Sequence, residues 1–148
     1  MELMFSMIVD PPVPFENRKK LRIPLFSTPV QAGFPSPADD HMDKALDLNE
    51  HLVSNPASTF FVKAKGDSMK DAGIMSGDIM IVDKSVSPKD KQIVVAMLDG
   101  EFTVKRLRRK SGQVFLVAEN NAFPPIEITS EQELVIWGVV TFVIHQPK

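Results

Sequence analysis

The sequence predicts a compact, mainly antiparallel β domain that carries a short helical segment and follows an extended N-terminal arm. Short segments rich in β-branched and aromatic residues succeed one another along the second half of the chain, a pattern typical of such domains. Asp99-Gly100 and Ser111-Gly112 lie between neighbouring segments, and glycine accepts the positive φ of a hairpin turn at little cost. The predicted strands are Thr59–Lys65, Asp78–Asp83, Gln92–Leu98, Glu101–Arg108, Val114–Ala118 and Leu134–Ile144.

Residues 1–33 are expected to form the arm, and residues 34–148 the β domain. Three prolines between Pro11 and Pro14 exclude a helix from this part of the arm. The apolar start, Met1–Val9, has no basic leader, and it is far shorter than the roughly 20 apolar residues of a membrane-spanning helix. We therefore expect a cytoplasmic protein that does not enter a membrane.

A short helix is predicted between the arm and the strands. Asp39 and Asp40 can cap it, the apolar residues up to Val53 have intermittent helical spacing, and Asn55-Pro56 ends it.

The composition is that of one soluble domain without a cysteine framework. The 148 residues carry a net charge of −2, which gives no general attraction to nucleic acid or to an anionic membrane. The absence of cysteine excludes disulfides, a thiol nucleophile and a Cys-ligated metal. None of His41, His51 and His145 has metal-ligand spacing, so we expect neither a metal nor a cofactor.

Three further groups of residues have ordinary structural explanations. Asp67, Asp71, Asp78 and Asp83 flank turns and strands, where aspartate is common. The basic run from Arg106 to Lys110 is typical of a solvated hairpin end, with phosphate binding as the less favoured interpretation. Trp137 lies in an apolar run, which favours a place in the core or at an interface.

Ser68 and Lys105 are the candidate catalytic residues. Ser68 follows a strand pattern that ends at Gly66, so a turn can present its hydroxyl to a partner. A serine hydroxyl needs a base, and a lysine serves as one only when it is neutral, which burial among apolar groups favours. A strand lysine usually faces water and a serine after glycine usually marks a turn, so the residues alone leave both interpretations open.

Several separated motifs resemble the self-cleaving serine peptidases of the LexA/UmuD family. They are Gly66-Asp67-Ser68-Met69, then Gly77-Asp78 before an apolar strand, then Asp99-Gly100-Glu101-Phe102-Thr103-Val104-Lys105. Upstream, Pro24-Leu25-Phe26-Ser27 and the segment from Val30 to Pro37 resemble the UmuD branch, so that the resemblance covers most of the chain. It implies a β domain like that of LexA and of signal peptidases.

The resemblance also implies a mechanism. Ser68 would attack the carbonyl of Ala32 while neutral Lys105 takes its proton, and the backbone N–H groups of Asp67 and Ser68 would form the oxyanion hole. On the residues alone Ala32-Gly33 is a simple turn, but in the family an Ala-Gly or Cys-Gly bond at this place is the one that the protein cuts in itself. The product would be residues 33–148.

The partners follow from the UmuD branch. The resemblance implies a homodimer that binds a Y-family, UmuC-like polymerase subunit in translesion synthesis and is cut under stimulation by a RecA–single-stranded DNA filament. It also implies a contact of Pro24–Ser27 with the replication clamp. A LexA-type repressor places a helix-turn-helix domain before its cleavage site, and 32 proline-rich residues cannot supply one, so direct sequence-specific DNA binding is disfavoured.

Three hypotheses from different classes remain open. The first is a self-processing enzyme of the SOS DNA-damage response whose product is a polymerase subunit. The second is a binding module in which the dyad matters little and the uncut arm is itself the functional state. The third is a plasmid- or phage-type regulatory protein of the same fold that acts by binding another protein. Type I signal peptidases share the Ser/Lys chemistry but need a membrane anchor.

Overall fold

The computed structural model describes residues 8–9, 12–15, 22–26 and 42–148. These residues fall into two compact units, one formed by the described residues up to Phe15 together with Asn55–Lys148, the other by those from Glu16 to Ser54. None of the helices in the described ranges is long and apolar enough to cross a membrane.

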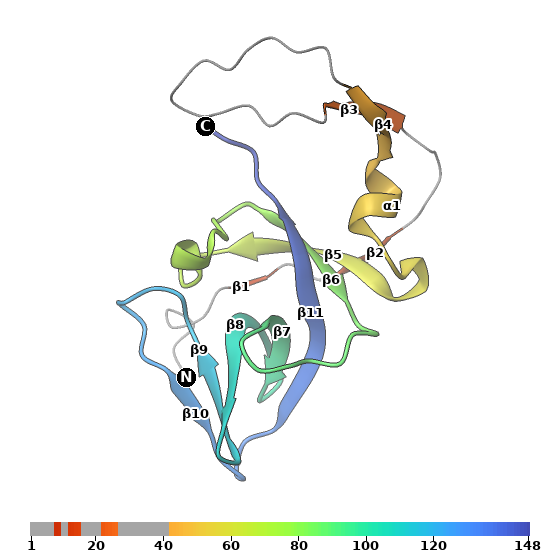
Figure 1. Ribbon diagram of the computed structural model, residues 1–148. Coiled ribbons are helices and arrows are strands. Elements are labelled where there is room, and N and C mark those ends of the chain that lie inside the picture. Colours follow the sequence, from red (N-terminus) through yellow and green to blue (C-terminus); the bar gives the residue numbers. More distant parts are fainter. Residues whose placement is uncertain (1–7, 10–11, 16–21, 27–41) are drawn as a thin grey trace. The chain divides into compact units, whose positions relative to one another are not determined.

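The larger unit is an antiparallel sheet of nine strands, which confirms the predicted fold class (Figure 1). The order across the sheet is β1-β5-β6-β11-β7-β8-β9-β10, and β2 also pairs with β5. All six segments predicted from the sequence are strands. The strands are β1 (Ile8–Val9), β2 (Val13–Pro14), β5 (Thr59–Lys65), β6 (Ile79–Asp83), β7 (Ile93–Leu98), β8 (Glu101–Lys110), β9 (Gln113–Val117), β10 (Ile126–Ile128) and β11 (Leu134–Ile144).

Both predicted hairpin turns are present. Asp99 and Gly100 join β7 to β8 with φ values of 49° and 84°, and Ser111 and Gly112 join β8 to β9 with 51° and 78°. Positive φ at both central residues is the geometry that matches the twist of two antiparallel strands. These turns fix β8 between β7 and β9, with Lys105 opposite Val94.

The smaller unit corrects the helix prediction. Residues 42–47 form β4 (Met42–Asp47), which pairs with β3 (Arg22–Phe26), and only Leu48–Leu52 are helical, as α1. Asp47 caps this helix, because its carboxylate accepts a hydrogen bond from the Asn49 N–H at 3.0 Å. Asp39 and Asp40, the predicted caps, lie outside the described residues.

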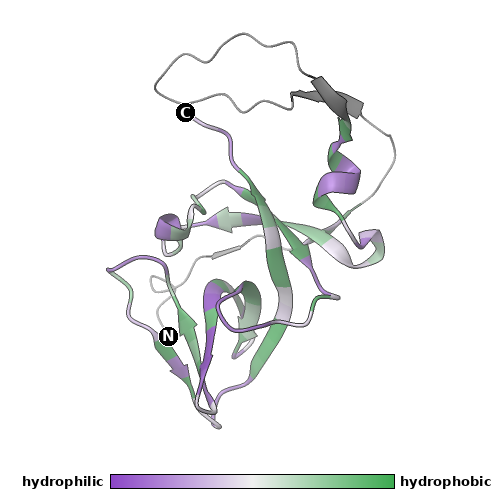
Figure 2. Cartoon of the chain, viewed as in Figure 1, coloured by the Kyte–Doolittle hydropathy of each residue, from purple (hydrophilic) through white to green (hydrophobic). Residues whose placement is uncertain are grey.

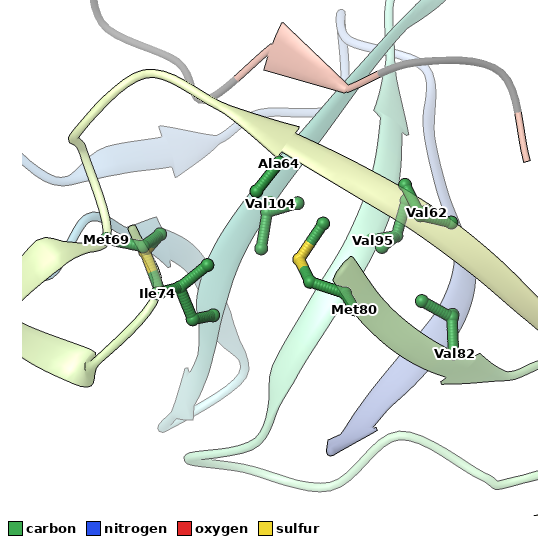
Figure 3. Close-up of a cluster of buried hydrophobic side chains, with 8 residues drawn as sticks. All are labelled: Val62, Ala64, Met69, Ile74, Met80, Val82, Val95 and Val104. Carbon is green, nitrogen blue, oxygen red and sulfur yellow. The ribbon is translucent and has the colours of Figure 1, made fainter. Parts of the chain in front are cut away.

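Two hydrophobic clusters fill the larger unit. In Figure 2 the hydrophobic colour follows β11, whereas the hydrophilic colour marks β8 toward its turn into β9. One cluster, shown in Figure 3, draws on β5, β6, β7, β8 and the loop after β5; its buried members are Val62, Ala64, Met69, Ile74, Met80, Val82, Val95 and Val104. The other contains Val94, Ala96, Leu107, Leu116 and Val139.

Candidate active site

Ser68 lies in the loop that follows β5. Gly66 ends the strand with a φ of 103°, a conformation that favours glycine, and a short 3₁₀ helix (Lys70–Ala72) begins two residues after Ser68. Met69 and Ile74 anchor this loop, since both are fully buried against Ala64 and Val104 (Figure 3). The loop therefore holds Ser68 inside the protein, where its relative exposure is 1%.

Lys105 lies in the middle of β8 and reaches Ser68. Its Nζ is 3.2 Å from Ser68 Oγ, although the two residues are 37 positions apart in the chain. Lys105 is 1% exposed and is among the largest fully buried side chains of the described residues. The structure thus brings together the two residues that the sequence singled out as a dyad.

Burial favours the neutral form of Lys105. Desolvation lowers the pKa of the Lys105 ammonium from 10.5 to about 8. At pH 7 roughly a tenth of such lysines are neutral, against well under one in a thousand for an exposed lysine. Ser68 Oγ lies within hydrogen-bond distance of this amine, which is the arrangement that activation of a serine nucleophile requires.

The backbone around Ser68 leaves donors available. Among the described residues, neither the N–H of Asp67 nor that of Ser68 donates a hydrogen bond, whereas the Gly66 N–H donates to Ser76 Oγ at 3.2 Å. The Asp67 carbonyl accepts from the Lys70 N–H and from the Asn120 side chain, at 3.2 and 2.9 Å. Two adjacent N–H groups beside the nucleophile are what an oxyanion hole needs.

Residues 119 and 120 support the loop that holds Ser68, and the sequence did not predict this. The Asp71 N–H donates to the Glu119 carbonyl at 2.8 Å, and the Asn120 amide braces Asp67. Glu119 also forms an ion pair with Arg106, the neighbour of Lys105. Asn120 lies 52 positions after Ser68, and no spacing rule links a loop asparagine to a distant turn, so the sequence holds no signal for this brace.

Thr103 is a second residue that the sequence reasoning passed over. It lies two positions before Lys105, on the same face of β8, and its hydroxyl is buried without a hydrogen-bond partner among the described residues. The strand predicted over Glu101–Arg108 could have pointed to it, because every second residue of a strand shares a face. A buried hydroxyl costs free energy when it has no partner.

The scissile bond proposed from the sequence, Ala32-Gly33, lies outside the described residues. Within the described ranges no group of three or more acidic, histidine or cysteine side chains could hold a metal ion. His145 Nδ1 pairs with Asp78 Oδ1 at 2.6 Å, and His51 is exposed. His41 lies outside the described residues.

The remaining candidates have structural roles. Burial would raise the pKa of Asp83, but hydrogen bonds from Asn55, Ser85 and Ser58 outweigh it and hold the pKa below its usual value. In the basic run, Arg108 pairs with Asp90. The Phe60 and Phe102 rings each form a T-shaped pair with Trp137, which packs partly buried against the core.

Comparison with known proteins identifies the family. The model of the family described as peptidase S24-like matches residues 24–141. The chain belongs to this family. The LexA/UmuD-like peptidases that the sequence motifs resemble are the group to which the match points, and a Ser/Lys pair inside a β domain agrees with it.

Named relatives support the assignment. Protein SamA of Salmonella typhimurium is 50% identical over 125 residues, which are 84% of this chain and 86% of that protein. Protein ImpA of Escherichia coli is 44% identical over 131 residues, 84% of this chain and 85% of ImpA. The LexA repressor of Aliivibrio fischeri is 40% identical over 131 residues, which cover 88% of this chain and 62% of the repressor.

Proposed function

We propose that the protein is a serine peptidase that cuts its own Ala32-Gly33 bond. The observation that carries this proposal is the buried contact of 3.2 Å between Ser68 Oγ and Lys105 Nζ. The peptidase S24-like match supports it, because it covers both residues and the scissile bond.

In the proposed reaction the Ser68 hydroxyl loses its proton to neutral Lys105 as its oxygen attacks the Ala32 carbonyl carbon. The N–H groups of Asp67 and Ser68 stabilise the oxyanion, and the loss of one such donor typically costs about a hundredfold or more in rate. Lys105 then gives its proton to the departing Gly33 amine, which leaves an ester between Ala32 and Ser68. Water, deprotonated by Lys105, hydrolyses this ester and restores the serine.

The product, Gly33–Lys148, is proposed to act as the accessory subunit of an error-prone translesion polymerase in the SOS response. Its partners would be a second copy of the chain, a UmuC-like polymerase subunit and the RecA–single-stranded DNA filament that stimulates cleavage in the cytoplasm. Pro24–Ser27 would contact the replication clamp. The resemblance of the motifs to the UmuD branch supports these assignments.

An exposed apolar pair supports the homodimer. Ile79 on β6 and Ile144 on β11 lie directly opposite each other, 40% and 45% exposed. Apolar side chains that remain exposed together on a sheet are typical of a surface that another protein covers.

Replacement of the nucleophile tests the proposal. We expect Ser68→Ala to fold normally, since alanine fits a buried serine site, and to release no fragment that begins at Gly33. The measurement is mass spectrometry of the wild type and of the variant, each incubated with an activated RecA filament. Release of this fragment from the variant at the wild-type rate would assign the nucleophile elsewhere.

A further inference from the structure

Strand β1 covers the outer edge of β5 immediately before Ser68. Ile8 lies opposite Lys65 and Val9 opposite Ala64, in antiparallel pairing. Farther along the same edge, Val13 and Pro14 of β2 lie opposite Phe61 and Phe60. β1 and β2 are therefore short strands added at the edge of the element that leads to Ser68.

The backbone directions show which groups β1 occupies. Ala64 uses both its N–H and its carbonyl on the other side of β5, where it bonds to Asp78 and Gly77 at 2.8 Å each. Because successive residues of a strand direct their polar groups to opposite edges, Lys65 directs its N–H and carbonyl toward Ile8. The Val9 N–H then points away from β5.

β1 also lies against β8, the strand that carries Lys105. Figure 1 shows β1 between the ends of β5 and β8, and Figure 3 shows it in pale red beside Ala64. The segment thus runs between β5, which leads into the loop that holds Ser68, and β8, which carries Lys105.

This edge has the geometry that holds an extended substrate segment. A peptide bond is presented to a serine nucleophile in an extended segment, and an exposed sheet edge holds such a segment through main-chain hydrogen bonds. Lys65 is three residues before Ser68, about 10 Å along an extended chain. Strands pair about 4.8 Å apart, so the edge at Lys65 accepts one segment at a time.

We propose that β1 is an internal competitor for the substrate-binding edge of the Ser68–Lys105 dyad. The segment that carries Ala32-Gly33, or the same segment of a second copy, reaches Ser68 after β1 has left Lys65. This inference rests on the proposed peptidase function, and it adds a step that precedes catalysis. The pairing of Ile8–Val9 with β5 slows cleavage, and any change that detaches β1 from β5 accelerates it.

The sequence allows β1 to detach without β2. Pro11 and Pro12 separate the two strands, and proline has no N–H to give to a sheet. The register of pairing with β5 shifts by one residue, because Val9 lies opposite Ala64 and Val13 lies opposite Phe61. The two short strands are therefore not one continuous ladder. A pairing of two residues is weak enough to open, whereas a long strand would block the site permanently.

A proline scan of β1 in the full chain tests the proposal. Ile8→Pro removes the N–H that faces Lys65, and Val9→Pro is the matched control because the N–H that it removes points away from β5. Net loss of one backbone hydrogen bond changes a population about two- to tenfold. We expect Ile8→Pro to accelerate activator-independent release of the Gly33 fragment by this factor, and Val9→Pro to leave the rate near that of the wild type.

Two measurements in the Ser68→Ala background do not need activity. Hydrogen exchange resolved by residue should show a faster Lys65 amide in Ile8→Pro, with the Ala64 amide unchanged because it donates to Asp78. A labelled peptide with the sequence of residues 28–37 should bind Ile8→Pro about two- to tenfold more tightly than the parent.

Each outcome has one meaning. Unchanged exchange at Lys65, or faster exchange without tighter peptide binding, overturns the proposal that β1 competes with substrate. Tighter peptide binding with no cleavage by any variant that retains Ser68 supports the competition and instead overturns the proposed peptidase function. Equal effects of Ile8→Pro and Val9→Pro show a general disturbance of the arm and also overturn the proposal.

Discussion

At Lys105 the proposed function and the stability of the fold conflict. A shift of its pKa from 10.5 to about 8 corresponds to about 3 kcal/mol of free energy that opposes folding at neutral pH. Apolar neighbours alone would favour an apolar side chain here. A cation retained in a dry site next to a serine hydroxyl is the pattern that marks functional sites more often than structural ones.

In the proposed mechanism the pH dependence of cleavage follows from this pKa. Only neutral Lys105 accepts the Ser68 proton, so the rate without an activator should rise about tenfold per pH unit below pH 7 and level off above about pH 8. Lys105→Arg should be inactive at every pH, because arginine stays charged. The measurement is the initial rate of fragment release between about pH 6 and pH 10. A flat profile, or an active arginine variant, would show that another group removes the serine proton.

Lys105→Met should be inactive and more stable than the wild type at neutral pH. Methionine fills a similar volume without a charge, so the free energy of unfolding should rise by up to about 3 kcal/mol. The loss of the hydrogen bond between Lys105 and Ser68 reduces this gain. The sign follows from linkage: the unfolded chain binds the lysine proton more tightly, so the wild type gains stability as pH rises from about 8 to 10.5. The advantage of the variant is therefore full below pH 8 and fades toward pH 10.5. Denaturant titrations at three pH values measure it, and a constant difference would contradict the buried cation.

Strands were easier to predict than the helix. Six strands carried runs of β-branched and aromatic residues, and two hairpins carried turn dipeptides, so local chemistry determined them. Residues 42–47 gave a helical spacing but form β4, because pairing with β3 overrides a weak local preference. β10 has three residues and β1 and β2 two each, too short for any periodic pattern.

Strand β11 has a constraint that hydropathy does not show. It carries irregularities on both sides of Gly138, and a Cβ at Gly138 would lie 2.6 Å from Val82 Cγ1 and 3.3 Å from the Asp83 carbonyl oxygen. Val82 is fully buried and cannot move aside cheaply. The glycine therefore allows β11 to approach β6 closely.

Gly138→Val should destabilise the fold by roughly 1–3 kcal/mol, the usual cost of excess volume in a packed core. Val135→Thr is the matched control, because this β11 residue is 57% exposed and should tolerate a β-branched polar side chain within about 0.5 kcal/mol. Thermal unfolding of both variants measures the difference. Equal midpoints would mean that β11 and β6 are not in close contact at Gly138.

The site as a whole could be predicted only in part. The resemblance of the motifs to the LexA/UmuD family singled out Ser68 and Lys105, and the structure brings them to 3.2 Å. No periodicity dictates that the turn after β5 folds over the middle of β8. That meeting depends on the strand order and on Met69, Asn120 and Glu119, which lie at unrelated positions in the sequence. Long-range contacts of this kind follow from the completed fold and are absent from any local pattern.

The proposed homodimer predicts that a charge at Ile79 disrupts the dimer. A charge placed in a buried apolar interface costs several kcal/mol, so Ile79→Asp should convert a dimer into monomers at micromolar concentration. Val135→Asp places the same charge on another exposed residue, away from the Ile79–Ile144 pair, and should leave the dimer intact. Sedimentation equilibrium of the uncut Ser68→Ala protein, with and without each change, distinguishes them. If the wild type is a monomer at tens of micromolar, or if the dimer tolerates Ile79→Asp, the Ile79–Ile144 pair does not form the dimer interface.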